Sequence, residues 1–196
     1  MGKIFCLMGK SSSGKDTIYK HLLEEMDLKR VVLYTTRPIR ENEQEGVEYH
    51  FCTSEEEEAF EKAGKIIEKR TYQTIHGPWD YFTVDDGSMD LKAWDYLMIG
   101  TLEAYESLCT YYTKDKIVPI YIEVEDGIRL SRALERERQQ KEPKYEEMCR
   151  RFLGDAKDFS EERLQECEIS KRFQNENLEK TVEAVKDYIL EMRQGS

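Results

Sequence analysis

A glycine- and serine-rich segment near the N-terminus has the residue types and the spacing of a loop that binds phosphate. It runs from residue 9 to residue 17 with the sequence GKSSSGKDT, follows the apolar run Ile4–Met8, and opens onto a segment with helical periodicity. Between a strand and a helix, the glycines of such a loop let successive backbone N–H groups point at phosphate oxygens, and the helix N-terminus adds partial positive charge. The sequence therefore predicts a nucleotide phosphate site at residues 9–17.

The side chains of this loop predict how a nucleotide is held. We expect Lys15 to place a cation on the β and γ phosphates. The predicted contacts to the donor nucleotide are Gly9, Ser11, Ser12, Ser13, Gly14, Lys15, Asp16 and Thr17. The position after the lysine usually carries a Ser or Thr hydroxyl that binds Mg²⁺, but here it is Asp16. Two interpretations stay open: Asp16 is the metal ligand, directly or through water, or its carboxylate repels the triphosphate.

Two arginines three residues apart, Arg37 and Arg40, follow the second apolar run of the chain. Guanidinium groups bind phosphate bidentately, so beside the first loop they indicate a site for a second phosphorylated substrate. Tyr49 would add a hydroxyl donor to it. The alternative is that both arginines pair on the surface with the glutamates between residues 41 and 45.

The composition limits the class of protein. The chain has 196 residues, of which 39% are hydrophobic and 36% charged, and its formal net charge is −11. We expect one globular domain with no nucleic-acid partner, because nonspecific nucleic-acid binding needs a broad positive surface. No apolar run has bilayer length and no signal peptide is predicted, so no membrane partner is expected. The five cysteines are scattered, which favours reduced thiols and a cytoplasmic location. Monomer and homodimer both stay open.

Apolar, β-branched stretches alternate with helical periodicity along most of the chain. The predicted strands cover residues 4–8, 31–34, 96–99, 117–124 and, weakly, 169–173. The predicted helices cover residues 17–26, 102–112, 126–138, 145–165 and 178–193. Such alternation predicts an α/β fold in which helices flank both faces of a parallel sheet.

Residues 37 to about 91 depart from this alternation. They are rich in charged and aromatic residues, with short predicted strands at 48–52 and 65–74 around a helix at 54–63. Ser54 would cap that helix, and the glutamates that follow suit its first turn. We interpret the region as a lobe inserted into the core.

A longer motif begins at the end of the second predicted strand. The pattern TTRxxRxxExxGxxYxF is matched by Thr35, Thr36, Arg37, Arg40, Glu43, Gly46, Tyr49 and Phe51. In this pattern the chain resembles guanylate kinase. Further along, residues 64–68 resemble the segment whose acidic residue contacts guanine, here Glu68. Residues 134–138 with Arg150 and Arg151 resemble the arginine-bearing lid, and residues 173–178 resemble the late loop whose asparagine, here Asn175, lies near adenine.

The resemblance implies a P-loop NTPase-type fold and an activity. It implies a single domain with a core of residues 1–36, 92–135 and 152–193, an NMP-binding lobe of about 37–91 and a helical lid of about 136–151. The implied reaction is ATP + GMP giving ADP + GDP, with Mg²⁺. The implied catalytic cations are Lys15, Arg37, Arg136, Arg138, Arg150 and Arg151. The arginines of the segment 129–138 are also consistent with a salt-bridged helix, because glutamates are interleaved with them.

The chain departs from the family at positions that contact the base. The family has a serine where this chain has Leu33, and its EID segment falls at residues 99–101, where Thr101 replaces the aspartate. The segment 76–83 is also altered. The predicted acceptor contacts are Arg37, Arg40, Tyr49, Glu68, Tyr81, Thr83 and Thr101. Lost base contacts weaken selectivity for guanine, so a kinase for different or broader NMPs remains an alternative, as does a noncatalytic guanylate-kinase-like binding module.

Overall fold

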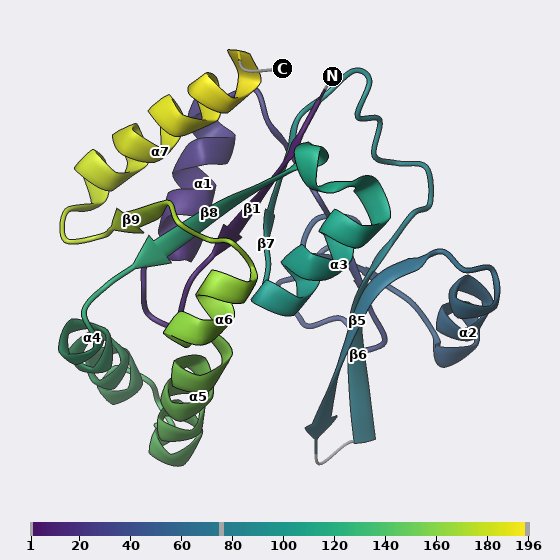
Figure 1. The fold of residues 1–196 in the computed structure, drawn as a ribbon. Helices are drawn as coiled ribbons and strands as arrows, with labels where there is room; N and C mark the ends of the chain where they lie inside the picture. The colour runs from purple at the N-terminus through teal and green to yellow at the C-terminus, as the bar shows by residue number, and fades with distance from the viewer. Residues whose placement is uncertain (1, 75–76, 195–196) are drawn as a thin grey trace.

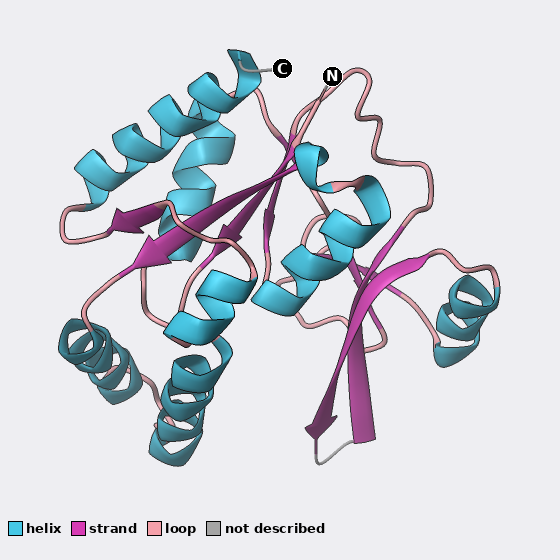
Figure 2. Cartoon of the chain, in the orientation of Figure 1, coloured by secondary structure: helices cyan, strands magenta, loops and turns pink. Residues whose placement is uncertain are grey.

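The computed structural model describes residues 2–74 and 77–194, and it contains two sheets with helices around them (Figures 1 and 2). Strands alternate with helices along most of the chain, as the sequence predicts. Within the described ranges, no helix combines the length and the apolar character that crossing a membrane would require.

The core sheet is entirely parallel. Its order is β2 (Lys29–Arg30), β7 (Tyr96–Ile99), β1 (Ile4–Met8), β8 (Ile117–Glu123) and β9 (Arg172–Gln174). All residues of the central strand β1 are fully buried, because helices cover both faces of the sheet. A continuous apolar run is therefore what this strand requires.

Two pairs of helices sandwich this sheet (Figure 1). On one face, α1 (Lys15–Glu25) and α7 (Leu178–Gln194) pack against Phe5 and Leu7 through Leu22 and Val185. On the other face, α3 (Leu102–Tyr112) and α6 (Glu161–Glu166) belong to the apolar cluster around Met98. A short 3-10 turn, η1 (Lys114–Lys116), leads into β8. The predicted α/β sandwich is confirmed.

The second sheet lies mostly in the region predicted to be the lobe. Its order is β4 (Tyr49–Phe51), β3 (Leu33–Thr35), β6 (Gly77–Val84) and β5 (Ile66–Thr74), and α2 (Ser54–Lys62) accompanies it. The strand predicted at 31–34 is wrong in detail, since β2 pairs within the core sheet while β3 opens the lobe sheet. The long strand β6 was not predicted.

Two helix boundaries also differ from the prediction. The helix expected at 145–165 is divided into α5 (Tyr145–Asp158) and α6, because Ser160 begins a new helix by accepting a hydrogen bond from the Arg163 N–H. The cap of α2 is Thr53 rather than Ser54, and Glu56 completes a reciprocal capping box with it. The helix α4 (Asp126–Arg138) has the predicted bounds.

Candidate functional site

The glycine loop lies between β1 and α1, where the sequence predicts it. Gly14 caps α1 with a φ of 87°, in the left-handed region that favours glycine. A Cβ at this position would lie 2.4 Å from the Nδ2 atom of Asn175. That amide is buried and donates a hydrogen bond to the Ser13 carbonyl at 2.8 Å. The loop is thus packed against the segment that follows β9.

A buried arginine holds the other side of the loop. Arg129, on α4, is 1% exposed and donates from Nη1 to the Ser11 carbonyl at 2.8 Å. The Ser11 N–H donates to Oδ2 of Asp155 on α5, also at 2.8 Å, and that oxygen lies 3.4 Å from the same arginine nitrogen. Arg129 further binds Asp126 and stacks over the Phe152 ring. Both backbone polar groups of Ser11 are therefore hydrogen-bonded to side chains: the carbonyl to Arg129 and the N–H to the Asp155 carboxylate.

Lys15 and Asp16 differ in how far they face solvent. The Lys15 side chain is 18% exposed and that of Asp16 is 75% exposed, with 3.9 Å between Nζ and the nearest carboxylate oxygen. This contact is long for a charge-assisted hydrogen bond. The Asp16 carboxylate is therefore mostly in solvent and does not block the space enclosed by the loop.

A cavity of about 450 Å³ adjoins this loop. Its lining residues are Ser12, Gly14, Asp16, Thr17, Arg132, Arg136, Asn175 and Leu178. It brings predicted loop residues together with Arg136 of the predicted lid and Asn175 of the segment that resembles the late loop. Its volume lies in the range of small-molecule and cofactor sites.

The oxygen atoms at this cavity suit a hard cation. No group of three or more His, Cys, Asp or Glu side chains with metal-binding geometry occurs in residues 2–74 and 77–194. Magnesium, however, is commonly held by one or two carboxylates together with substrate phosphates and water. Asp16 and Thr17 supply a carboxylate and a hydroxyl at the cavity wall, so the residues present fit Mg²⁺.

A second cavity, of about 230 Å³, lies between the loop and the helices α4 and α5. Ser12 and Arg136 line both cavities, and Arg151 lines the second. Arg138 and Arg150 line neither.

The two predicted arginines of α5 are paired within their own helix. Arg150 and Arg151 each donate from Nε to Glu147, at 2.7 and 2.8 Å. These hydrogen bonds lower the pKa of Glu147 to about 2. Both guanidinium groups remain largely exposed.

In the lobe, the two signature arginines have different surroundings. Arg37 is 2% exposed, and its two Nη atoms donate to the Glu43 carboxylate at 2.9 and 2.7 Å. Its Nε donates to the Tyr81 hydroxyl at 3.1 Å, and the hydrogen bonds that Arg37 donates to Glu43 raise the pKa of Arg37. The Arg37 guanidinium predicted to bind phosphate is thus bonded to a glutamate of its own segment, in a pair that is largely buried and not on the surface.

Arg40 is exposed instead. Its backbone N–H donates to Glu43, but its guanidinium has no ion pair within the described chain. The Tyr49 ring lies nearby, 5.5 Å from the Arg37 guanidinium carbon and 5.5 Å from the Tyr81 ring. Among the predicted phosphate contacts of the lobe, Arg40 is therefore the cation with free donors.

The predicted base contacts are only partly together. Glu68 is 3% exposed at its side chain and accepts a hydrogen bond from the Thr83 hydroxyl at 2.9 Å. Its second oxygen accepts one from Nε of Arg70 at 3.2 Å. Thr101 instead caps α3 by accepting from the Ala104 N–H, and Leu33 packs against the apolar core. Of the altered segment 76–83, residue His76 lies outside the described residues.

In sequence, the chain is similar to known proteins mainly over its N-terminal part. Residues 1–78 match the family model described as guanylate kinase. Over these residues the chain is similar to guanylate kinase. It is 35% identical over 77 residues to the guanylate kinase of Fusobacterium nucleatum, covering 39% of this chain and 40% of that protein. It is 37% identical over 99 residues to that of Neisseria gonorrhoeae, covering 50% and 46%. The chain thus aligns with less than half the length of these relatives.

The likeness in fold covers the whole chain. A crystal structure of guanylate kinase from Anaplasma phagocytophilum matches with a TM-score of 0.65 at 21% identity, covering 100% of this chain and 87% of that one. The signature from Thr35 to Phe51 lies inside the matched residues 1–78. The resemblance of the lid arginines and of the Asn175 loop lies beyond them and remains a prediction.

Three residues of the site were not singled out from the sequence. Arg132 lines the larger cavity and donates to the Asn175 carbonyl at 3.3 Å. Its spacing of four residues from Arg136 on α4 was the available signal. Arg70 shares a strand face with Glu68 by two-residue alternation. Asp155 gave no signal, because its partner Ser11 lies 144 residues away.

Proposed function

We propose that this protein is a nucleoside monophosphate kinase that transfers the γ-phosphoryl group of ATP to GMP, giving GDP and ADP. One observation supports it most: a glycine loop with a partly exposed lysine shares a cavity with Arg136, beside a lobe that carries the family's acceptor signature. In Figure 1, the α4–α5 pair and the β5–β6 hairpin project from the end of the core sheet at which β1 leads into the loop.

On this proposal the protein positions charges and does little covalent chemistry. Lys15 and loop N–H groups other than that of Ser11, which is bonded to Asp155, bind the donor phosphates. Arg40 and Tyr49 bind the acceptor phosphate, while Arg37 holds the lobe segment and Tyr81 in place. Bound Mg²⁺ would neutralise charge on the β and γ phosphates, and Asp16 is the residue we assign to it.

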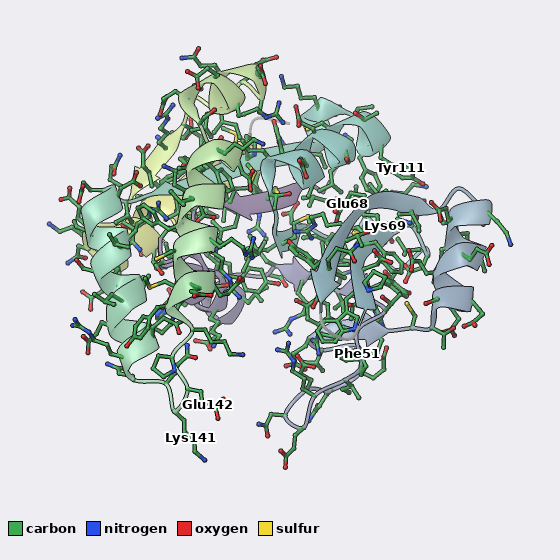
Figure 3. The ribbon with its side chains drawn as sticks, turned by 90° about the horizontal axis from the view of Figure 1, so that it is seen from below. Phe51, Glu68, Lys69, Tyr111, Lys141 and Glu142 are labelled. Carbon is green, nitrogen blue, oxygen red and sulfur yellow. The ribbon has the colours of Figure 1, made fainter. Side chains whose placement is uncertain are left out.

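The predicted lid would act from the side of the site that lies opposite the acceptor lobe. Figure 3 shows Phe51 on the lobe and, across the view, Lys141 and Glu142 on the connection between α4 and α5. Arg136 and Arg151 line the cavity next to the loop, so they are the lid cations that we assign to the transferring group. We assign Arg138 and Arg150 a smaller part in this step, since neither lines the cavities.

The residues predicted to contact the acceptor base differ in what they can offer to guanine. Glu68 and Thr83 supply an acceptor and a hydroxyl in one place, which suits the N–H groups of guanine. Leu33 offers no hydrogen bond, and Thr101 uses its oxygen as a helix cap. These two positions support a second candidate, a kinase with a broader set of nucleoside monophosphates.

A turnover screen tests both candidates. The purified protein is given ATP and, in turn, GMP, dGMP, AMP, UMP, CMP and dTMP, and ADP release is measured. A kcat/KM for GMP and dGMP at least tenfold higher than for the other acceptors would support the guanylate assignment. Equal kcat/KM values would support the broader kinase. No transfer to any acceptor, with no rise of the melting temperature in ATP, would favour a noncatalytic binding module.

A further inference from the structure

Two adjacent serines of the loop carry hydroxyl groups that bond to nothing in the described chain. The Oγ atoms of Ser12 and Ser13 are buried and have no hydrogen-bond partner there. A buried hydroxyl without a partner costs stability, because it gave up its bonds to water. Ser13 is fully buried and lines neither cavity of the loop, whereas Ser12 lines both. Of these two residues, therefore, only Ser12 borders cavities that a ligand could enter.

Ser12 also carries backbone strain. Its φ is 62°, in the left-handed region that a side chain disfavours. Thr113 and Glu168 are the other non-glycine residues with positive φ in the described ranges. A glycine at residue 12 would remove both the strain and the unpaired hydroxyl. Strain of this kind concentrates at functional sites. The serine at this position therefore indicates an interaction that forms only when a ligand is bound.

The position of Ser12 indicates where that interaction forms. It shares one cavity with Gly14, Asp16 and Arg136, and the other with Arg136 and Arg151. Its hydroxyl thus lies where the glycine loop meets the predicted lid cations. No hydrogen bond holds its hydroxyl in place, so a rotation about χ1 from one staggered position to another can turn it toward a ligand at low cost.

We propose that the Ser12 hydroxyl donates a hydrogen bond to the terminal phosphoryl group of bound ATP and is a catalytic residue of the transfer. This inference rests on the proposed kinase function. In the transfer, the bond from the γ-phosphorus to the β–γ bridging oxygen breaks, and ADP keeps the electron pair. A new bond forms to an acceptor phosphate oxygen, and the serine keeps its proton throughout. Its hydrogen bond neutralises part of the charge on the moving group.

Nucleotide binding and protein stability, measured on Ser12→Gly, test the proposal. Calorimetry compares the affinity for ADP with that for β,γ-imido-ATP, which carries a γ-phosphoryl group that is not transferred. We expect the variant to lose about tenfold in affinity for the imido analogue relative to ADP. We also expect its melting temperature without nucleotide to rise, because strain and an unpaired hydroxyl are removed. An unchanged affinity ratio, or a lower melting temperature, would overturn the proposal.

Three further variants separate the hydroxyl from the strain. Ser12→Ala removes the hydroxyl and keeps a side chain at positive φ, so the same loss of relative affinity is expected without the full gain in stability. Glu168→Gly removes left-handed strain outside the site, and Tyr112→Phe removes another buried hydroxyl without a partner. Neither is expected to change the affinity ratio. If either changes it as much as Ser12→Gly does, the effect is not specific to Ser12 and the proposal fails.

The binding comparison needs no acceptor, so it distinguishes the two proposals. If the wild-type protein transfers phosphoryl to none of the monophosphates, the proposed function fails, and with it the catalytic role of Ser12. The γ-phosphoryl contact itself would then still be judged by the affinity ratio. If transfer occurs and Ser12→Gly keeps the full kcat, the kinase stands and the catalytic role of Ser12 is overturned.

Discussion

Arg129, beside the glycine loop, and Arg37, beside the second sheet, are both almost fully buried, yet they make different contacts. Arg129 binds the Ser11 carbonyl of the loop and ties it to α4 and α5. Arg37 binds the Glu43 carboxylate of its own segment and the Tyr81 hydroxyl. The first therefore joins two distant parts of the chain, and the second stiffens one lobe.

The comparison shows which cations can bind a ligand. A buried guanidinium must have its charge and donors satisfied inside the protein, so each of these arginines is occupied. Among the described residues, two cations with free donors stand next to them: Lys15 beside the glycine loop and Arg40 beside the Arg37–Glu43 pair. We infer that burial separates scaffold cations from ligand-binding cations in both halves of the site.

The largest effect is expected at Lys15. Lys15→Ala removes the cation of the donor loop, and we expect kcat/KM to fall by about a thousandfold, with a melting temperature close to that of the wild type. Lys10→Ala is the control, because Lys10 belongs to the same loop but pairs with Asp126. Its kcat/KM should stay within about threefold of wild type. Equal losses in both variants would show that general positive charge, not Lys15, supports transfer.

A smaller effect should separate the two lobe arginines. Arg40→Ala is expected to raise the KM for the acceptor by about ten- to a hundredfold, the loss of one or two charge-assisted hydrogen bonds, without changing the melting temperature. Arg37→Ala is expected to lower the melting temperature, because Glu43 loses its partner. The comparison fails if Arg40→Ala leaves the acceptor KM unchanged while Arg37→Ala raises it at unchanged stability.

The smallest effect is expected at Asp16. If its carboxylate is the metal ligand, Asp16→Ser should raise the Mg²⁺ concentration for half-maximal activity by about three- to tenfold, since a neutral oxygen binds Mg²⁺ more weakly. The Mg²⁺-dependent rise of the melting temperature with ADP should shift in the same direction. Glu24→Ser, an exposed acid on the same helix, is the control. A faster variant with an unchanged Mg²⁺ requirement would instead identify the Asp16 carboxylate as repulsive to the triphosphate.

The sequence predicts the elements whose signals are local. The bounds of α3 and α4 agree with their predicted ranges, because their helical periodicity is unbroken and capped. The strand expected at 31–34 was divided, because sheet membership depends on partners such as Tyr96 and Tyr49 that are distant in the sequence. The break before α6 depends on Ser160, a capping signal inside a run of helical periodicity.

In the candidate site, too, the sequence predicts the features whose signals are local. The glycine loop and the signature arginines are contiguous motifs, so their positions could be predicted. The partners that fix them could not, with the exception of Glu43, which belongs to the signature itself. Asp155 and Arg129 contact Ser11 across 144 and 118 residues, and no periodicity links residues so far apart.

Those long separations have a consequence for how the protein matures. The loop that would grip the nucleotide is made among the first residues, but its braces come from Arg129, Asp155 and Asn175, and the last of these bonds to Ser13 across 162 residues. A chain still emerging from the ribosome can form β1 and α1 early, yet it gains a rigid loop only after Asn175 has been made and has folded back. Nucleotide affinity should therefore appear only after residue 175 has been synthesised.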